Sequence, residues 1–415
     1  MRSTKPTVAV LATIDSKGRE ALFVADALAR AGARPWLLDL SLKPHDRAFE
    51  GVGGQRVAEA AGASWRALGG RSRLEASAAM AEGARRLLLA KFAKGEIAGA
   101  IGLGGANGTG LACSVMRALP YLVPKVMVSA VAATAAVEWY VGESDIVMVP
   151  SIGDISRNRI TDAVMENAAL ALAAAARNFM AKRDEKRDHP PLVAISSFGG
   201  TAPCVERVGE RLEASGYEVI LFHASGVGGR SLERLAASGE LAGVVDLTTH
   251  ELTDLLVDGV YSAGENRLTS AGAAGLPQVV VPGATDHANF WVGAAPQRFE
   301  GRDFLQYNEH NLLMRTDGEE FASLGRLFAE RLNRANGPVR VLIPLEGFSE
   351  HTRRRVSDLA GNDKGSWKRA EDYRVFAEAL KADLRVASVE ELALHINDGA
   401  FADACAEAFL AIAKP

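Results

Sequence analysis

The two halves of this 415-residue chain repeat one order of apolar runs, and this repeat limits the folds open to the chain. The runs PTVAVLAT and PLVAISSF, near the start of each half, are both followed by a helical stretch that ends at a glycine, Gly32 or Gly216. A second apolar run, PWLLDL or YEVILF, comes next. Each half therefore begins with a predicted strand, helix and strand.

The correspondence between the halves continues through two more apolar runs. GEIAGAIGLGG (95–105) matches GELAGVVDLTT (239–249), and PKVMVSA (124–130) matches PQVVVPG (277–283). Short runs rich in Val, Ile and Leu that alternate with helical stretches are typical of a parallel sheet covered on both faces. The sequence predicts two α/β domains in tandem, each a doubly wound and mainly parallel sheet.

A charged segment separates the two halves. KRDEKRDHPP (182–191) holds seven charged residues and two prolines, a composition that cannot bury itself or continue a helix. The alternative is an exposed loop inside a single domain. A chain of this length favours two domains, which we place at 1–185 and 190–415.

The composition argues against several classes of partner. The formal net charge is -4 and there is no long basic run, which disfavours nucleic acid and anionic membranes. The first apolar run is too short for a signal peptide, and the most apolar helical stretch carries charged residues. Three cysteines without close spacing disfavour a zinc cluster or a disulfide framework. We expect a cytoplasmic protein without a metal site.

The densest glycine cluster in the chain is IGLGGANGTGL (101–111), between a predicted strand and a predicted helix. Backbone N–H groups at a helix N-terminus bind anions, so this loop is a candidate phosphate site. It lacks the lysine of a P-loop, and Asn107 stands where a dinucleotide fingerprint needs its third glycine. The alternative is a tight connection between strand and helix.

Polar residues follow other predicted strands of the first domain at the same edge. TIDSKG (13–18) places Asp15, Ser16 and Lys17 after the first strand, where they suit a phosphate or a metal. Ser129 and Asp154 end two later runs. Ligands of doubly wound sheets bind outside the carboxyl ends of the strands, so we expect these residues to lie near the glycine loop.

The second domain carries different chemistry at the equivalent positions. TTHE supplies His250 and Glu251, and PGATDHANFW supplies Asp286 and His287. Histidines and carboxylates at strand ends suit acid–base catalysis, so these four are the catalytic candidates. EGFSEH adds His351 at another predicted strand end.

These motifs, taken together, carry a family resemblance over nearly the whole chain. The chain resembles the ATP-binding N-terminal domain family of the tomato mosaic virus resistance protein and its uncharacterised bacterial homologues. The segments that carry it are VAVLATIDSKGRE (8–20), GLGGANGTGL (102–111), KVMVSAVA (125–132), IVMVPSIGDI (146–155), ISSFGGTAPCV (195–205), VVVPGATDHANFW (279–291), NLLMRTDGEE (311–320) and PLEGFSEH (344–351).

The resemblance implies two Rossmann-like domains, a homodimer, and ATP, with or without Mg²⁺, bound in the first domain. It also implies a separate TIM-barrel protein as a partner. The family's D-T-K-G pattern falls on Asp15, Ser16, Lys17 and Gly18, and its V-S-T pattern on Val128, Ser129 and Ala130. The family's glycine loop falls on Gly104, Gly105, Ala106, Asn107, Gly108 and Thr109.

Three functions stay open on the sequence. The first is an ATP-binding protein whose phosphates lie on 104–109 and the 13–18 loop. The second is an enzyme with a cleft between its domains, a nucleotide-dependent transferase or ligase acting on a small polar metabolite. The third is a nucleotide-gated binding module for the barrel partner.

Overall fold

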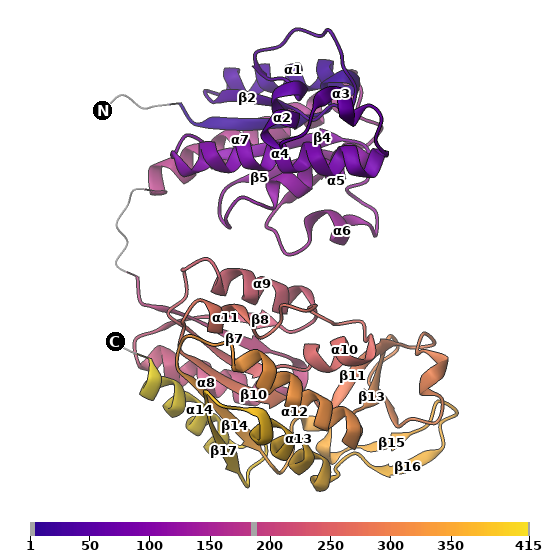
Figure 1. Ribbon diagram of the computed structural model, residues 1–415, viewed down its shortest axis with the longest axis vertical. Helices are drawn as coiled ribbons and strands as arrows, with labels where there is room; N and C mark the ends of the chain where they lie inside the picture. Colours follow the sequence, from indigo (N-terminus) through magenta and orange to yellow (C-terminus); the bar gives the residue numbers. More distant parts are fainter. Residues whose placement is uncertain (1–4, 184–188, 414–415) are drawn as a thin grey trace. The chain divides into compact units, whose positions relative to one another are not determined.

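The computed structural model describes residues 5–183 and 189–413 of the chain. It divides into two compact units, 1–187 and 188–415 (Figure 1). Residues 184–188 of the charged segment at 182–191 lie outside the described residues. No helix in the described ranges combines the length and the apolar character needed to span a bilayer.

The first unit is a six-stranded parallel sheet with the order β3-β2-β1-β4-β5-β6. β1 lies in the middle, and the chain runs outward from it twice, first through β2 and β3 and then through β4. The order therefore reverses between β1 and β4. The strands are β1 (Thr7–Ala12), β2 (Arg34–Asp39), β3 (Gly51–Val52), β4 (Gly99–Gly104), β5 (Lys125–Ser129) and β6 (Val147–Pro150).

Helices cover both faces of this sheet, as the unbroken apolar strands require. Val8 and Val10 of β1 pack against α1 and α7, whereas Ala9 and Leu11 face α2, α4 and α5. The helices are α1 (Ile14–Arg30), α2 (Gly54–Ala60), α3 (Trp65–Leu68), α4 (Arg73–Ala93), α5 (Ala106–Met116), α6 (Val137–Val141) and α7 (Arg159–Arg183).

The second unit has a parallel sheet of the same design, with the order β17-β14-β10-β9-β7-β8. The order β8-β7-β9-β10-β14 reproduces β2-β1-β4-β5-β6, so the internal repeat and the fold class predicted from it are confirmed. The strands are β7 (Leu192–Ser197), β8 (Glu218–His223), β9 (Gly243–Thr248), β10 (Gln278–Gly283), β14 (Val339–Pro344) and β17 (Ser388–Leu392).

Two helical layers cover this second sheet. α8 and α14 pack on one face, and α9, α11, α12 and α13 pack on the other. The helices are α8 (Ala202–Ala214), α9 (Val227–Ala236), α10 (Glu251–Val257), α11 (Ser270–Ala273), α12 (Gly318–Leu332), α13 (Ala370–Asp383) and α14 (Gly399–Ile412), with 3-10 turns η1 (Gly199–Thr201), η2 (Gln297–Phe299) and η3 (Glu350–Arg353).

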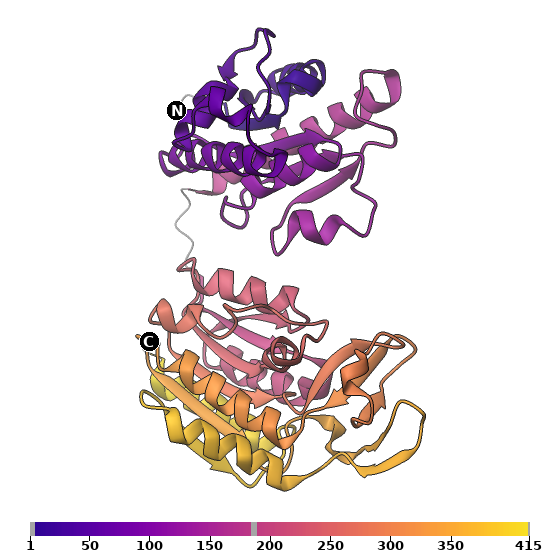
Figure 2. The same ribbon diagram turned by 45° about the vertical axis from the view of Figure 1, so that its right-hand side comes forward.

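The second unit also contains an antiparallel sheet that the sequence did not predict. Its five strands have the order β11-β13-β12-β15-β16, and they extend from one end of that unit (Figure 2). Its apolar side chains form a small core of their own. The strands are β11 (His287–Trp291), β12 (Phe304–Gln306), β13 (Asn311–Arg315), β15 (Arg355–Ser357) and β16 (Asp363–Ser366).

Candidate functional site

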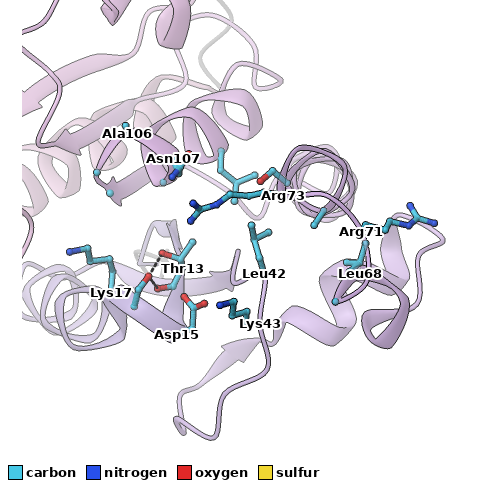
Figure 3. Close-up of a pocket in the computed structure, with 18 residues that line it drawn as sticks. Thr13, Asp15, Lys17, Leu42, Lys43, Leu68, Arg71, Arg73, Ala106 and Asn107 are labelled. Carbon is cyan, nitrogen blue, oxygen red and sulfur yellow. Dashed lines mark hydrogen bonds between the residues drawn. The ribbon is translucent and has the colours of Figure 1, made fainter.

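A pocket of about 610 Å³ opens at the carboxyl ends of β1 and β4, where the strand order of the first sheet reverses. This is the position at which doubly wound sheets bind ligands. The turn after β1 and the glycine loop after β4 both line it (Figure 3). Its lining from these segments is Thr13, Asp15, Ser16, Lys17, Gly104, Gly105, Ala106, Asn107, Gly108 and Leu111.

The glycines of the loop serve different purposes. None of the five has a positive φ, so no sharp left-handed turn requires them. A Cβ on Gly102 would lie 2.6 Å from the sulfur of Met127, and one on Gly104 would lie 2.7 Å from Cα of Gly108. These two glycines are needed for close packing of β4 against its neighbours.

Gly105 has no such structural requirement. Its φ of -75° suits any residue, and a Cβ built on it would meet no atom within 4 Å. Gly105 lines the pocket and is the N-cap of α5. The missing side chain therefore keeps space open in the pocket, directly in front of a helix N-terminus.

The first turn of α5 presents backbone donors to this space. Thr109 N–H makes the first helical hydrogen bond, to the Gly105 carbonyl at 2.8 Å. Helix geometry leaves the preceding N–H groups, those of Ala106, Asn107 and Gly108, without an intrahelical acceptor. Unpaired donors and the helix dipole together favour an anion at this position.

Thr109 and Ser129 lie behind the pocket rather than in its lining. Both side chains are fully buried, and their hydroxyl oxygens are 2.7 Å apart. The Thr109 hydroxyl also donates to the Gly104 carbonyl at 3.2 Å. These two residues join α5 to β4 and β5, so they hold the loop in position.

The turn after β1 contributes one acidic and one basic side chain to the pocket. Oδ1 of Asp15 is buried without a hydrogen-bond partner, which makes it the free acidic oxygen of the pocket. The Lys17 ammonium donates to the Ile155 carbonyl and lies 3.8 Å from the carboxylate of Asp154. Asp154 is largely exposed and does not line the pocket, although it neighbours a residue that does.

Three basic residues in the lining were not predicted from the sequence. They are Lys43, Arg71 and Arg73, which come from the loop after β2 and from the start of α4. The Arg73 side chain points toward the space between Asn107 and Thr13 (Figure 3). With Lys17, the lining has four basic side chains and a single carboxylate. The pocket therefore favours an anion.

One buried carboxylate holds the pocket edge together. Asp39, at the end of β2, accepts hydrogen bonds from the N–H groups of Ile14, Ser41 and Gly54, at 3.2, 2.9 and 3.1 Å. The Ser41 hydroxyl donates to Asp39 and accepts from the Asp15 N–H at 2.9 Å. Asp39 thereby connects the turn after β1 with the loop that carries Lys43.

In the second unit, the structure brings three of the four catalytic candidates together. His250 and His287 stack with ring centroids 5.7 Å apart, and Asp286 lies 3.2 Å from Nδ1 of His287. All three are fully buried. Burial lowers the pKa of His250 well below its usual value, and the nearby His287 and Arg267 lower it further.

The fourth candidate, Glu251, is not part of this cluster, and its carboxylate has a structural role. Its carboxylate pairs with buried Arg267 at 2.6 Å and accepts the N–H groups of Gly226 and Gly229. Asp246 pairs with the same arginine at 2.5 Å. Because both of its carboxylate oxygens are hydrogen-bonded within the core, Glu251 is not available for acid–base chemistry in this arrangement.

Among residues 5–183 and 189–413, no group of three or more His, Cys, Asp or Glu side chains has an arrangement that could hold a metal ion. The three cysteines, Cys113, Cys204 and Cys405, are free and buried. The polar chemistry of the described residues is therefore concentrated in the anion-favouring pocket and in the histidine cluster.

Comparison with known proteins places the chain among bacterial and plant relatives. A protein of Rhizobium meliloti (strain 1021) is 38% identical over 98% of this chain and 99% of its own length. One of Mesorhizobium japonicum is 39% identical over 98% of both chains. The ToMV resistance protein Tm-1(GCR237) of Solanum lycopersicum is 36% identical over 76% of this chain, which corresponds to 42% of the tomato protein.

Two family models match the two units in turn. Residues 6–181 match the N-terminal domain, and residues 190–413 the C-terminal domain, of an uncharacterised protein family, UPF0261. Together they span nearly all of the chain. The chain belongs to the UPF0261 family.

Proposed function

We propose that the N-terminal unit binds a nucleotide through its phosphates, and that the nucleotide is ATP. The observation that carries this proposal is the convergence of two loops at one strand-order reversal. Eight of the eleven residues predicted to bind nucleotide line the same pocket, which also has four basic side chains. The choice of ATP rests on the resemblance to the ATP-binding family described above.

The phosphates would lie on the N-terminus of α5, in the space that Gly105 leaves open. Arg73 and Lys43 make no ion pair or hydrogen bond with any of the residues that the structure describes, so both are free to pair with phosphate oxygens. Mg²⁺ prefers carboxylate and phosphate oxygens, and the unpartnered Oδ1 of Asp15 supplies the carboxylate.

Gly105 provides the sharpest test of this site. Gly105→Asp places a negative charge in the open space without a steric clash, because a Cβ there meets nothing within 4 Å. Gly105→Asn is its uncharged match in size. Isothermal titration of the full chain with ATP and Mg²⁺ should show binding that Gly105→Asp weakens at least tenfold, and more than Gly105→Asn does.

A charge control separates this effect from the change in net charge. Ala174→Asp introduces the same charge on the exposed side of α7 and should leave ATP binding unchanged. The proposal fails if the wild-type chain gives no heat with ATP, or if Gly105→Asp binds as the wild type does. Release of inorganic phosphate, measured on the same samples, then distinguishes hydrolysis from binding alone.

A further inference from the structure

A second pocket, of about 190 Å³, lies wholly within the C-terminal unit. The segment after β7, which includes Phe198 and Gly200, forms one side of it, and Asn289 of β11 forms another. His351 of η3 and the rings of Tyr261 and Tyr307 also contribute to its lining. The antiparallel sheet thus borders a site at the carboxyl end of the parallel sheet.

Asn289 offers an unused hydrogen-bond acceptor to this pocket. Its side chain is 2% exposed, and its Oδ1 has no partner. Nδ2 of Asn289 donates to Asp254 at 3.0 Å, and a carboxylate can only accept, which fixes the orientation of the amide. Burial raises the pKa of Asp254 to about 6, while the hydrogen bonds from Asn289 act in the opposite direction.

Several buried histidine nitrogens also have no hydrogen-bond partner. Nδ1 of His351, a lining residue 2% exposed, is buried without a partner. His287 lies next to it, with ring centroids 5.1 Å apart, and its Nε2 is also unpartnered. Both nitrogens of His250 are unpartnered as well. An unpaired buried polar atom is unfavourable, so a cluster of them indicates a ligand.

Asp286 determines which form His287 takes. One carboxylate oxygen accepts from the Ser349 hydroxyl at 2.8 Å and from the Trp367 indole N–H at 2.9 Å, and the other faces Nδ1 of His287. Burial acts to raise the pKa of Asp286, but the hydrogen bond and charge of His287 outweigh it and hold the pKa at about 2. Because the carboxylate of Asp286 can only accept, the proton between the two groups lies on Nδ1 of His287.

The lining carries no formal charge, in contrast to the pocket of the N-terminal unit. No lysine, arginine, aspartate or glutamate is among its lining residues. Three aromatic rings, Phe198, Tyr261 and Tyr307, supply flat apolar walls. A phosphate or carboxylate ligand would find no lysine or arginine in this lining to pair with, which is unfavourable.

We propose that this pocket binds a small, uncharged molecule with several hydroxyl groups, such as a short sugar alcohol or a hydroxyketone. Its hydroxyls would donate to Oδ1 of Asn289 and to Nδ1 of His351, and its C–H faces would contact the aromatic walls. The volume corresponds to about six water molecules at about 30 Å³ each, which limits the ligand to a few carbon atoms. This site does not depend on nucleotide binding by the N-terminal unit.

Saturation-transfer NMR on the full chain tests the proposal. The probes are glycerol, erythritol and dihydroxyacetone, each at millimolar concentration, with glycerate and glycerol phosphate as anionic counterparts. At least one uncharged probe should receive saturation, and the anionic probes should bind more weakly at this site. If none of the uncharged probes receives saturation, the proposal is wrong.

The variant Gly199→Leu tests whether the saturation received by the probes comes from this pocket. A Cβ on Gly199 meets only the Tyr307 hydroxyl, at 3.7 Å, so a leucine has room to enter the pocket and should reduce saturation at least fivefold. Ala202→Leu makes a similar change at an exposed position in the same segment and should have no effect. Saturation that Gly199→Leu leaves unchanged would overturn the proposal.

Two further variants serve as controls. One replaces Gly199→Leu if that variant does not fold, and the other tests whether the probes bind in the N-terminal unit. Should Gly199→Leu unfold the C-terminal unit, Tyr307→Ala replaces it, because Tyr307 is half exposed and its loss removes a wall of the pocket. Gly105→Asp, in the other unit, should leave the saturation unchanged. Loss of the signal in that variant would show that the probes bind in the pocket of the N-terminal unit, which would overturn the proposal. It would not test whether that pocket binds ATP.

Discussion

The carboxylate of Asp39 accepts a hydrogen bond from the backbone N–H of Ile14 at 3.2 Å, which joins the end of β2 to the turn after β1. This bond and those to Ser41 and Gly54 give a fully buried charge its compensation. The pocket of the N-terminal unit therefore depends on a residue that does not line it.

Replacing Asp39 should weaken both the fold and the site. Asp39→Ala leaves several buried N–H groups unpaired, at about 1–3 kcal/mol each, so we expect the N-terminal unit to lose about 3 kcal/mol of stability. Asp39→Asn keeps one acceptor oxygen and should lose less. Thermal unfolding measures the loss, and titration with ATP at a temperature where both variants are folded measures the site. An Asp39→Ala chain as stable as the wild type would contradict the role assigned to this carboxylate.

Arg73 should contribute to ATP affinity through charge. Its guanidinium is solvent-exposed, so the contribution is limited by screening. We expect Arg73→Ala to weaken ATP binding about threefold to tenfold, and the difference to shrink as salt is added. Arg66→Ala removes an equivalent exposed charge from α3, outside the pocket, and should leave the affinity unchanged. Equal effects of the two substitutions would show that only net charge matters.

The two neighbouring glycines should respond in opposite ways to alanine. Gly104→Ala drives a Cβ to 2.7 Å from Gly108, backbone against backbone, and should destabilise the N-terminal unit by about 1–3 kcal/mol. Gly105→Ala adds a methyl group in open space and should change stability by less than about 0.5 kcal/mol. Urea unfolding compares them. Similar losses from both would mean that Gly105, too, is there for packing.

The sequence was sufficient for the central strands of the parallel sheets, but not for their edge strands β3 and β17 or for the antiparallel sheet. Buried strands such as β1 and β4 show as continuous apolar runs, and the repetition of such runs predicted the central strand pattern of both units. β16, with the sequence DKGS, has no apolar pattern, and β12 and β15 have three residues each. These short strands pair because the larger domain brings them together, which local pattern cannot reveal.

The same limit applies to the pocket. Residues that directly follow β1 and β4 could be placed at one sheet edge from topology alone. Arg71 and Arg73 follow no strand; they reach the pocket because α4 starts beside it. Lys43 could have been predicted at this sheet edge in the same way as Lys17, since it comes shortly after β2. Thr109 and Ser129 were predicted to bind the ligand but do not line the pocket. Their hydroxyl groups hold the glycine loop in position instead.

Arg267 should be essential to the stability of the C-terminal unit. It is fully buried and pairs with Glu251 at 2.6 Å and Asp246 at 2.5 Å. Arg267→Met leaves these carboxylates without their countercharge and should cost about 3–5 kcal/mol. Arg298→Met removes an exposed ion pair with Asp258 and should cost less than about 1 kcal/mol. Chemical unfolding followed at Trp367 distinguishes the two.

His351 should make the C-terminal unit sensitive to acid. Burial is the main cause that lowers the pKa of His351 from 6.5 to about 3; the charges of His287 and Arg354 act in the same direction, and that of Asp286 opposes them. The unfolded chain therefore binds a proton that the folded chain excludes between these pH values. Stability is full above pH 6.5 and falls as the pH drops toward 3, by at most about 1.4 kcal/mol for each pH unit.

Replacement of His351 isolates this effect from opposing ones. The raised pKa of Asp254 acts in the other direction, since it makes the folded chain less stable as the pH rises from 3.8 to about 6. Comparing His351→Phe with the wild type cancels that contribution. The difference in unfolding free energy between the two chains should shift steadily in favour of His351→Phe from pH 6.5 to pH 4.5, whereas His310→Gln, at a largely exposed position, should follow the wild type. A difference that stays constant over this range would mean that His351 takes up its proton in the folded state as readily as in the unfolded one.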